Sequence, residues 1–222
     1  MLNYIDNIVG INHFLIVSIL IIPIIYIIFY KNFNDLNKLL YFLLVLNFIT
    51  FYPYLLSTGS FDYTLHLPLH LCYITELAIL ISFIFKTKKI YPLLVLNSMF
   101  GGFVGFINSN LTGDSTSIEY IHYYISHFNL MLFFIIAFKS EMEISFSDLI
   151  KSIISNSFVM LLIIIFNFLF KTNYWFTYSK PVGTNLSIFF PEWPYYFILL
   201  ITIGLFSYGL TFTLLLNNKV KK

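Results

Sequence analysis

The sequence predicts an all-α, polytopic membrane protein with seven transmembrane helices, and three observations lead to this fold class. First, 59% of the 222 residues are hydrophobic and only 10% are charged, against roughly 25% charged in soluble domains. Second, seven apolar runs of roughly 20 residues each match the length of a membrane-spanning helix. Third, the runs lack the alternation of barrel strands, and only helices and closed barrels satisfy every backbone amide in lipid. We expect residues 1–222 to form one transmembrane domain.

The seven predicted helices are joined by mostly short connections. In chain order they are Ile11 to Tyr30, Leu39 to Ser57, Leu67 to Phe85, Ile90 to Ser109, Glu119 to Phe138, Leu149 to Phe170 and Trp193 to Leu216. The last connection, residues 171–192, is long, and loops of this kind are often functional. The alternative interpretation is an aromatic segment resting among lipid headgroups. We expect no cleaved signal, because a basic n-region is missing and the first apolar run is too long.

The lysines predict the orientation of the chain. All 12 basic residues are lysines, and ten of them fall on one side of the predicted helices. These ten are Lys31, Lys38, Lys86, Lys88, Lys89, Lys139, Lys151, Lys219, Lys221 and Lys222. The positive-inside rule therefore places the C-terminus in the cytoplasm and the N-terminus outside the cell membrane. The net charge of +2 is too small and dispersed for nucleic acid, so we expect membrane lipids as partners and leave the oligomeric state open.

The densest polar set inside a predicted span begins at His66 and ends at Glu76. Pro68 fits the first turn of a helix, which places His70 and Cys72 in the first two turns. A helix N-terminus favours a thiolate over a short distance. Cys72 and Glu76 are four residues apart and share a helical face. Because Cys72 is the single cysteine, a disulfide or Cys-based zinc site is excluded, and we expect no cofactor.

A second polar set lies in the fifth span around His127. Spans three and five run in the same direction, so Cys72 and His127 fall at similar depths when residues are counted at about 1.5 Å each. A buried thiol needs a neighbouring base to become a nucleophilic thiolate. His127 is the candidate base, and His70 is a weaker base or an orienting group.

Each of these residues also has a structural interpretation. A lone buried cysteine is more often a small hydrophobic residue, and Glu76 is as well suited to helix-to-helix hydrogen bonding as to proton handling. His66 and His70 have metal-pair spacing, yet no third ligand is evident. We expect His13 and His122 to be solvated at the outer boundary. The small residues of the fourth span, Gly101, Gly102 and Gly105, favour close helix packing over ligand binding.

The order of several motifs resembles that of YwaF-type bacterial membrane proteins. The motifs are His70-Leu71-Cys72, the glycine-rich fourth span ending in Asn108 to Asp114, His127, Asn173-Tyr174-Trp175-Phe176, Lys180-Pro181 and Trp193-Pro194-Tyr195-Tyr196. The resemblance covers Pro68 to Tyr196. Departures occur at Gly113, where the family usually has proline, and at Phe190 to Tyr196, where its Gly-Pro-Trp-Pro-Trp-Tyr is altered.

This family is similar to a larger group whose animal members are seven-span phospholipid acyltransferases. The resemblance implies that Cys72 carries an acyl group and that His127 assists it, with Asn173, Tyr174 and Lys180 in the substrate site. Lys180 is expected to hold a lipid phosphate as a point charge, with Glu76 and Trp193 as further substrate contacts. Lipid acyl transfer or hydrolysis is thus the predicted activity. The alternatives are a small-solute carrier or receptor, in which Glu76, His70 and His127 line a path, and a structural membrane protein.

Overall fold

A computed structural model describes residues 2–112, 114–181 and 186–220 of the chain. Outside the described residues lie Gly113, residues 182–185 of the predicted long loop, and the two C-terminal lysines, Lys221 and Lys222. Within the described part, the chain forms seven α-helices and no strand, which confirms the all-α prediction. The helices are α1 (Leu2–Phe29), α2 (Phe33–Thr58), α3 (Leu71–Ile84), α4 (Tyr91–Ile107), α5 (Ser117–Lys139), α6 (Phe146–Phe170) and α7 (Tyr195–Val220).

Four of these helices are long and apolar enough to cross a membrane, namely α2, α5, α6 and α7, the last over Tyr195–Leu216. The apolar stretches Leu15–Phe29, Leu71–Ile84 and Tyr91–Ile107 are shorter. Helix α3 has 14 residues, which is about 21 Å of helix against a hydrocarbon core of about 30 Å. The predicted start at Leu67 was too early, because His70 is the N-cap and Pro68 precedes the helix.

The helix ends follow from local sequence. Asn32 caps α2 by accepting hydrogen bonds from the backbone N–H groups of Asn34 and Asp35, and Gly59 ends it with φ of 69°, a conformation that favours glycine. At the start of α5, the Glu119 carboxylate accepts a hydrogen bond from the backbone N–H of Thr116. These caps satisfy backbone groups that the helices leave open at their ends.

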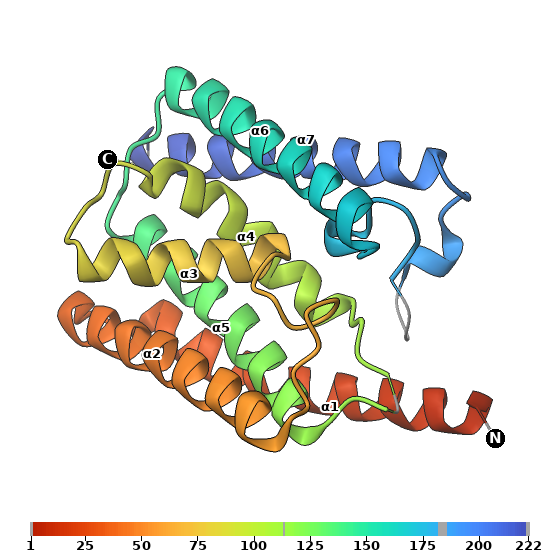
Figure 1. Ribbon diagram of the computed structural model, residues 1–222. Coiled ribbons are helices and arrows are strands. Elements are labelled where there is room, and N and C mark those ends of the chain that lie inside the picture. The colour runs from red at the N-terminus through yellow and green to blue at the C-terminus, as the bar shows by residue number, and fades with distance from the viewer. Residues whose placement is uncertain (1, 113, 182–185, 221–222) are drawn as a thin grey trace.

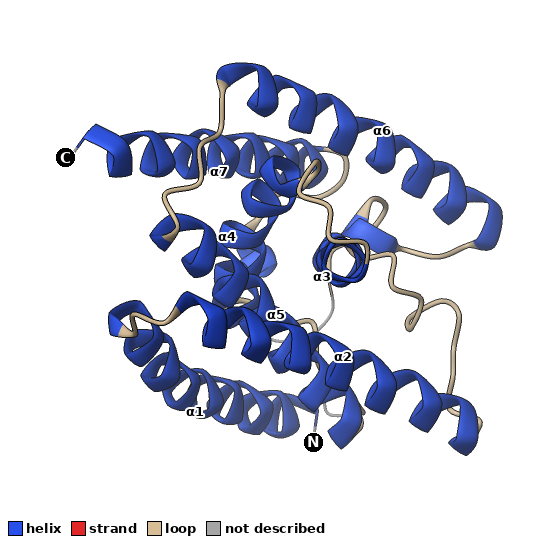
Figure 2. Cartoon of the chain, turned by 90° about the vertical axis from the view of Figure 1, so that its left-hand side faces the viewer, coloured by secondary structure: helices blue, strands red, loops and turns tan. Residues whose placement is uncertain are grey.

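Helix α5 lies at the centre of the molecule and is the most buried of the long helices (Figure 1). Helices α1 and α2 pack on one side of it, whereas α6 and α7 lie together on the opposite side and pack mainly against α4. Helix α3 is seen end-on in Figure 2, between the α6 side and the α2 side of the molecule. Helix α3 packs against α4, α5 and α2.

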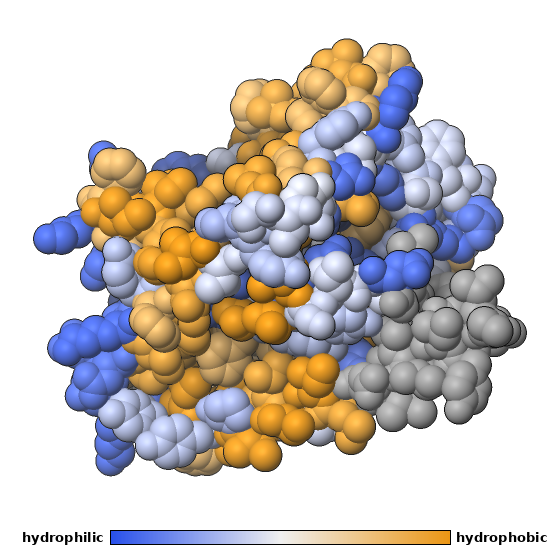
Figure 3. Space-filling model, turned by 60° about the horizontal axis from the view of Figure 1, so that its bottom comes forward, coloured by the Kyte–Doolittle hydropathy of each residue, from blue (hydrophilic) through white to orange (hydrophobic). Residues whose placement is uncertain are grey.

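The outer surface of the helices is apolar. Large side chains such as Phe29, Phe85 and Phe158 are more than half exposed, and apolar residues cover much of the face shown in Figure 3. A soluble monomer rarely exposes so much contiguous apolar surface. The surface is therefore suited to contact with lipid hydrocarbon.

Candidate active site

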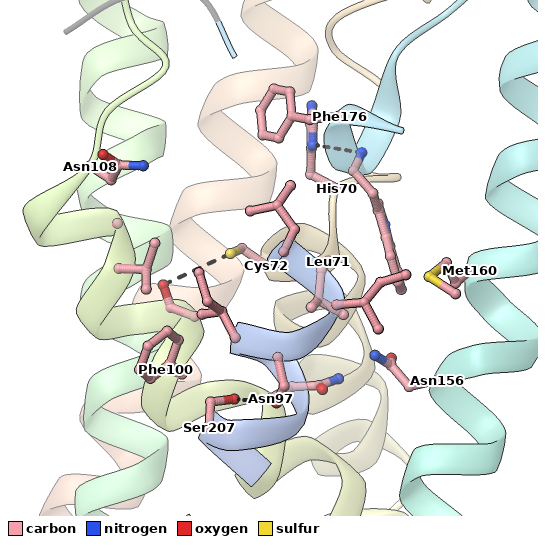
Figure 4. A pocket seen from close by; sticks show the side chains of 18 of the residues that line it. His70, Leu71, Cys72, Asn97, Phe100, Asn108, Asn156, Met160, Phe176 and Ser207 are labelled. Atoms are coloured by element: carbon pink, nitrogen blue, oxygen red, sulfur yellow. Dashed lines mark hydrogen bonds between the residues drawn. The ribbon is translucent and has the colours of Figure 1, made fainter. Parts of the chain in front are cut away.

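A cavity of about 360 Å³ lies between α3, α4, α5, α6 and α7, with the loop after α6 at one end. All three predicted catalytic residues, Cys72, His127 and His70, line it. Its volume is within the range of small-molecule sites, and its lining is mostly apolar with a few polar groups, as such sites usually are. Figure 4 shows Cys72 facing this space from the start of α3.

Cys72 sits in the first turn of α3, closer to the helix N-terminus than the sequence predicted. Its Sγ lies 3.9 Å from the carbonyl oxygen of Gly101 on α4. A methyl group added to Gly101 would meet that sulfur at 3.5 Å, an ordinary van der Waals distance.

His127 lies against the same face of α4, one turn further along. A Cβ added to Gly105 would fall 1.8 Å from Cδ2 of His127, so only glycine allows the imidazole this position. Gly101 and Gly105 are four residues apart and share a helical face. The thiol and the imidazole therefore both lie beside α4 and line the same cavity. The small residues of α4 also serve packing, since Gly102 lies against the backbone of His127.

Cys72 and His127 lie at the same distance from the ends of their helices, and their depth in a membrane stays a prediction. Helices α3 and α5 run in the same direction in Figure 1 and end at Ile84 and Lys139. Counted back from these ends at 1.5 Å per residue, both side chains start about 18 Å away.

Hydrogen bonding fixes the tautomer of His127. Its Nδ1 lies 2.7 Å from the carbonyl oxygen of Tyr123, and because a carbonyl can only accept, Nδ1 carries the proton. In the neutral ring, Nε2 is then the free base. Tyr123 in turn donates its hydroxyl to the carbonyl of Gly105 at 2.8 Å, which ties the histidine turn of α5 to α4.

His70 is held by the short helix η1 (Tyr174–Phe176) at the loop end of the cavity. The backbone N–H of Trp175 points to Nδ1 of His70 at 3.4 Å, and the indole Nε1 of Trp175 donates to the Leu69 carbonyl at 2.7 Å. The ring of Phe176 lies 5.0 Å from the His70 ring. This arrangement suits an orienting role better than that of a free base.

The other predicted substrate residues do not line this cavity. Tyr174 is buried behind it, where its hydroxyl donates to the Tyr63 carbonyl at 2.7 Å and accepts from the Leu67 N–H at 3.1 Å. This burial raises the pKa of Tyr174 to about 12. Asn173 donates to Ser179 within the same loop. Lys180 pairs with Glu192 at 2.7 Å, and Trp193 donates to the Thr177 carbonyl.

Glu76 belongs to a separate buried cluster. Its carboxylate accepts hydrogen bonds from Asn47 (3.0 Å) on α2 and from Ser126 (2.6 Å) and Asn129 (2.7 Å) on α5. Cys72 and Glu76 therefore contact different helices, although they are four residues apart on α3. His122 joins the cluster through Asn47 at 3.0 Å.

The prediction that His13 and His122 are solvated was wrong. His122 is 2% exposed and His13 is 4% exposed, because both face neighbouring helices. His13 contacts the Tyr124 hydroxyl and the Phe106 carbonyl. The pair His66 and His70 also diverges, since His66 contacts Glu119 at 3.2 Å. Among the described residues, no three His, Cys, Asp or Glu side chains converge on a metal position.

Sequence reasoning missed the polar group at the other end of the cavity. There the Tyr208 hydroxyl of α7 donates to Oδ1 of Asn97 on α4 at 2.5 Å, and Asn97 donates to Thr75 at 3.1 Å. Asn156 of α6 also lines the cavity. The signal for these residues was their polarity inside apolar spans, which is costly without a partner.

The family model described as the TMEM164 family matches residues 7–212 of the chain. The chain belongs to the TMEM164 family. Family membership and the apolar helices fit an integral membrane protein. The match includes Cys72, His127 and every helix that lines the cavity of this TMEM164 family member. No curated protein and no solved structure matches the chain.

Proposed function

We propose that this TMEM164 family member is a cysteine-dependent lipid acyltransferase, with hydrolysis as the variant reaction when water replaces the acceptor. One observation carries the proposal: the only cysteine and a tautomerically fixed histidine line the same largely apolar cavity. A nucleophile, a base and an apolar pocket are the three parts that acyl transfer from a lipid requires.

The first half-reaction transfers an acyl group to the enzyme. Nε2 of His127 takes the thiol proton, and Sγ of Cys72 attacks the ester carbonyl carbon of the donor lipid. A C–S bond forms, the ester C–O bond breaks, and His127 returns the proton to the leaving alcohol oxygen, which yields a lysolipid.

The second half-reaction reverses these roles. His127 removes the proton of an acceptor hydroxyl, the acceptor oxygen attacks the thioester carbon, and the C–S bond breaks. The thiol of Cys72 then recovers its proton from His127. A lysolipid acceptor gives transfer and a water molecule gives hydrolysis, so the two reactions differ only in the acceptor.

His70 and the loop after α6 supply orientation in this proposal. Tyr174 and Asn173 shape the loop segment that holds His70, and Trp193 anchors the loop. Lys180 is proposed to hold a lipid phosphate, for which it has to leave Glu192, whose side chain is 87% exposed. A substrate contact by Glu76 requires its carboxylate to give up hydrogen bonds that it accepts from α2 and α5.

The proposal also includes the topology and the relationship to YwaF-type proteins and animal acyltransferases. Seven spans with the N-terminus outside and the C-terminus in the cytoplasm place the lysine-rich loops on the cytoplasmic side of the cell membrane. In a Cys72→Ala background, a membrane-impermeant maleimide should label Asp114→Cys on intact cells and spare Lys88→Cys. The opposite labelling would invert the orientation.

The deciding experiment is intact-mass analysis of protein purified from native membranes, with and without hydroxylamine. Wild type should carry an acyl mass that hydroxylamine removes, Cys72→Ala should lack it, and His127→Gln should change its amount. His13→Gln is a matched control, because His13 is also buried and contacts a backbone carbonyl. A thioester that is indifferent to His127→Gln would be peripheral acylation and would contradict the proposal. An unmodified and inert thiol would favour the carrier or the structural protein.

A further inference from the structure

The Glu76 cluster lies apart from the cavity and contains a buried carboxyl group without a counter-ion. Asn47, Glu76, Ser126 and Asn129 are completely buried, and none of them lines the cavity. Among the described residues, Glu76 takes part in no ion pair. A buried charge is costly unless an opposite charge or a bound proton neutralises it. The cluster therefore needs a positively charged species.

The side chains that face Glu76 from α2, α3 and α4 supply no positive charge. The ionisable groups that interact with it electrostatically are Tyr52 on α2 and Cys72 and Tyr73 on α3. A phenol or a thiol is either neutral or negative, so these three groups cannot balance a carboxylate. Helix α4 meets α3 next to Glu76 through Asn97, which does not ionise.

His122 on α5 is held in its neutral form by the hydrogen bonds of the cluster. Asn47 directs its Nδ2 to Glu76, and its Oδ1 faces Nδ1 of His122 at 3.0 Å. Because an amide oxygen only accepts, Nδ1 carries the ring proton. Nε2 is buried without a partner in the described chain, so a second proton there would be a buried N–H without an acceptor, which is costly. His122 therefore does not supply the missing charge.

The cluster is also short of hydrogen atoms. Two of its buried atoms, Nε2 of His122 and Oδ1 of Asn129, have no partner among the described residues, and both are acceptors. The donors on Asn47, Ser126 and Asn129 lie 2.6–3.0 Å from the carboxyl oxygens, which leaves no room for a metal ion between them. A proton supplies both a hydrogen atom and a positive charge, and it needs no additional space.

Ser126 allows this proton to bind without the movement of a heavy atom. Its Oγ lies 2.6 Å from Oε2 of Glu76, a normal distance for an O–H···O bond in either direction. When Glu76 is ionised, the serine hydroxyl donates. When Oε2 carries the proton, Glu76 donates, and the serine hydroxyl turns to the carbonyl four residues earlier in its helix, as Ser82 and Ser98 do. Both protonation states are therefore hydrogen-bonded.

We propose that Glu76 is a proton-binding site, whose carboxyl group holds a proton in the folded protein at neutral pH and donates it to Ser126. The proton comes from water and forms an O–H bond at Oε2. The site is separate from Cys72 and His127 and does not depend on the proposed acyl transfer. It makes the junction of α2, α3 and α5 sensitive to pH, because loss of the proton leaves an unbalanced buried charge.

Infrared spectroscopy tests the protonation state directly. The protein carries isotope-labelled glutamate carboxyl groups and is measured in lipid nanodiscs at neutral pH. Glu76 is buried, and the other glutamates of the chain are partly or fully exposed. Wild type should show the label-shifted carbonyl band of a protonated carboxyl group. The band should be absent in Glu76→Gln, unchanged in the exposed control Glu143→Gln, and shifted in Ser126→Ala, which removes the hydrogen-bond acceptor.

The pH dependence of unfolding is the second measurement. An unfolded glutamate releases its proton above about pH 4, whereas folded Glu76 keeps it, so the folded state binds one proton more. The resulting stability is fully present below that pH and is lost as pH rises. From about pH 5 to 8, the unfolding constant of wild type should rise about tenfold per pH unit relative to that of Glu76→Gln. Glu143→Gln should follow wild type.

The two measurements can each overturn the proposal. A folded wild type without the labelled carbonyl band would show an ionised Glu76, and equal pH dependence in wild type and Glu76→Gln would show that no extra proton is bound. If Glu76→Gln does not fold, the labelled wild-type spectrum and its shift in Ser126→Ala decide the question. Neither measurement uses a lipid donor, so failure of the proposed acyl transfer leaves both expected results unchanged.

Discussion

The two sides of α3 use buried polar residues in opposite ways. On one side, Glu76 is bonded to Asn47, Ser126 and Asn129, so three helices are joined by one carboxylate. On the other side, Cys72 and His127 face a cavity, and the only hydrogen bond of the Cys72 thiol in the described chain is a long contact to Gly101. Polar groups that bond one another hold helices together, whereas polar groups that face open space are available to a ligand.

The comparison separates structural from functional residues in a way that polarity alone does not. Burying any polar residue in hydrocarbon is costly, which is why both sets were conspicuous in the sequence. The distinction comes from glycine: Gly105 creates the room for His127 on the Cys72 side. The Glu76 side is not fully paired, since Nε2 of His122 and Oδ1 of Asn129 have no partner among the described residues.

The largest expected effect comes from His127 on the cavity side. His127→Gln should reduce the rate of acyl transfer by about 10²- to 10⁴-fold, because general base catalysis typically contributes that much. Thermal unfolding should change little, since glutamine can still donate to the Tyr123 carbonyl. Turnover of a phospholipid donor with a lysolipid acceptor measures the rate. A loss below tenfold would remove His127 from the chemistry.

Glu76→Leu should instead affect stability. Removal of the carboxylate leaves three donors without an acceptor, and each such group costs about 1–3 kcal/mol when buried. The free energy of unfolding in detergent should therefore fall by several kcal/mol. Ethyl maleimide should still react with Cys72 in the protein that remains folded. Glu76→Gln should recover most of the stability. If Glu76→Leu stayed stable and lost only activity, Glu76 would be a substrate residue after all.

A smaller effect is expected when the room on the cavity side is reduced. Gly105→Ala pushes a Cβ into the His127 ring, and such overpacking costs about 1–3 kcal/mol. We expect a displaced imidazole and acyl transfer at least tenfold slower. Gly101→Ala meets its neighbours at 3.4 and 3.5 Å, which is ordinary contact, so transfer should change by less than threefold. Equal effects of the two substitutions would argue against the importance of His127 placement.

Much of this arrangement was predictable from the sequence. Apolar runs and their spacing indicated seven helices. The sequence also paired Cys72 with His127, and both line the cavity, although their pairing stays a prediction. Helix rotation was not predictable: Cys72 and Glu76 share a face by spacing, yet their neighbours on α4, α2 and α5 decide what each contacts. Asn47 and Asn97 end the same Leu-Leu-Val-Leu-Asn sequence, yet one bonds Glu76 and the other closes the cavity. Those differences depend on tertiary packing.

The smallest expected effect sharpens the comparison at Tyr174, which the sequence placed in the substrate site. Its hydroxyl is hydrogen-bonded to the backbone of both Tyr63 and Leu67. Like the Glu76 carboxylate, it is therefore paired within the protein and does not face the cavity. Tyr174→Phe should lower stability by about 1–2 kcal/mol and change acyl transfer less than threefold. Because burial raises its pKa to about 12, the neutral phenol stabilises the fold below pH 10, and this contribution is lost as pH rises towards 12. Across that range, the free energy of unfolding should fall less with rising pH in Tyr174→Phe than in wild type. A large loss of activity at unchanged stability would instead place the Tyr174 hydroxyl on the substrate.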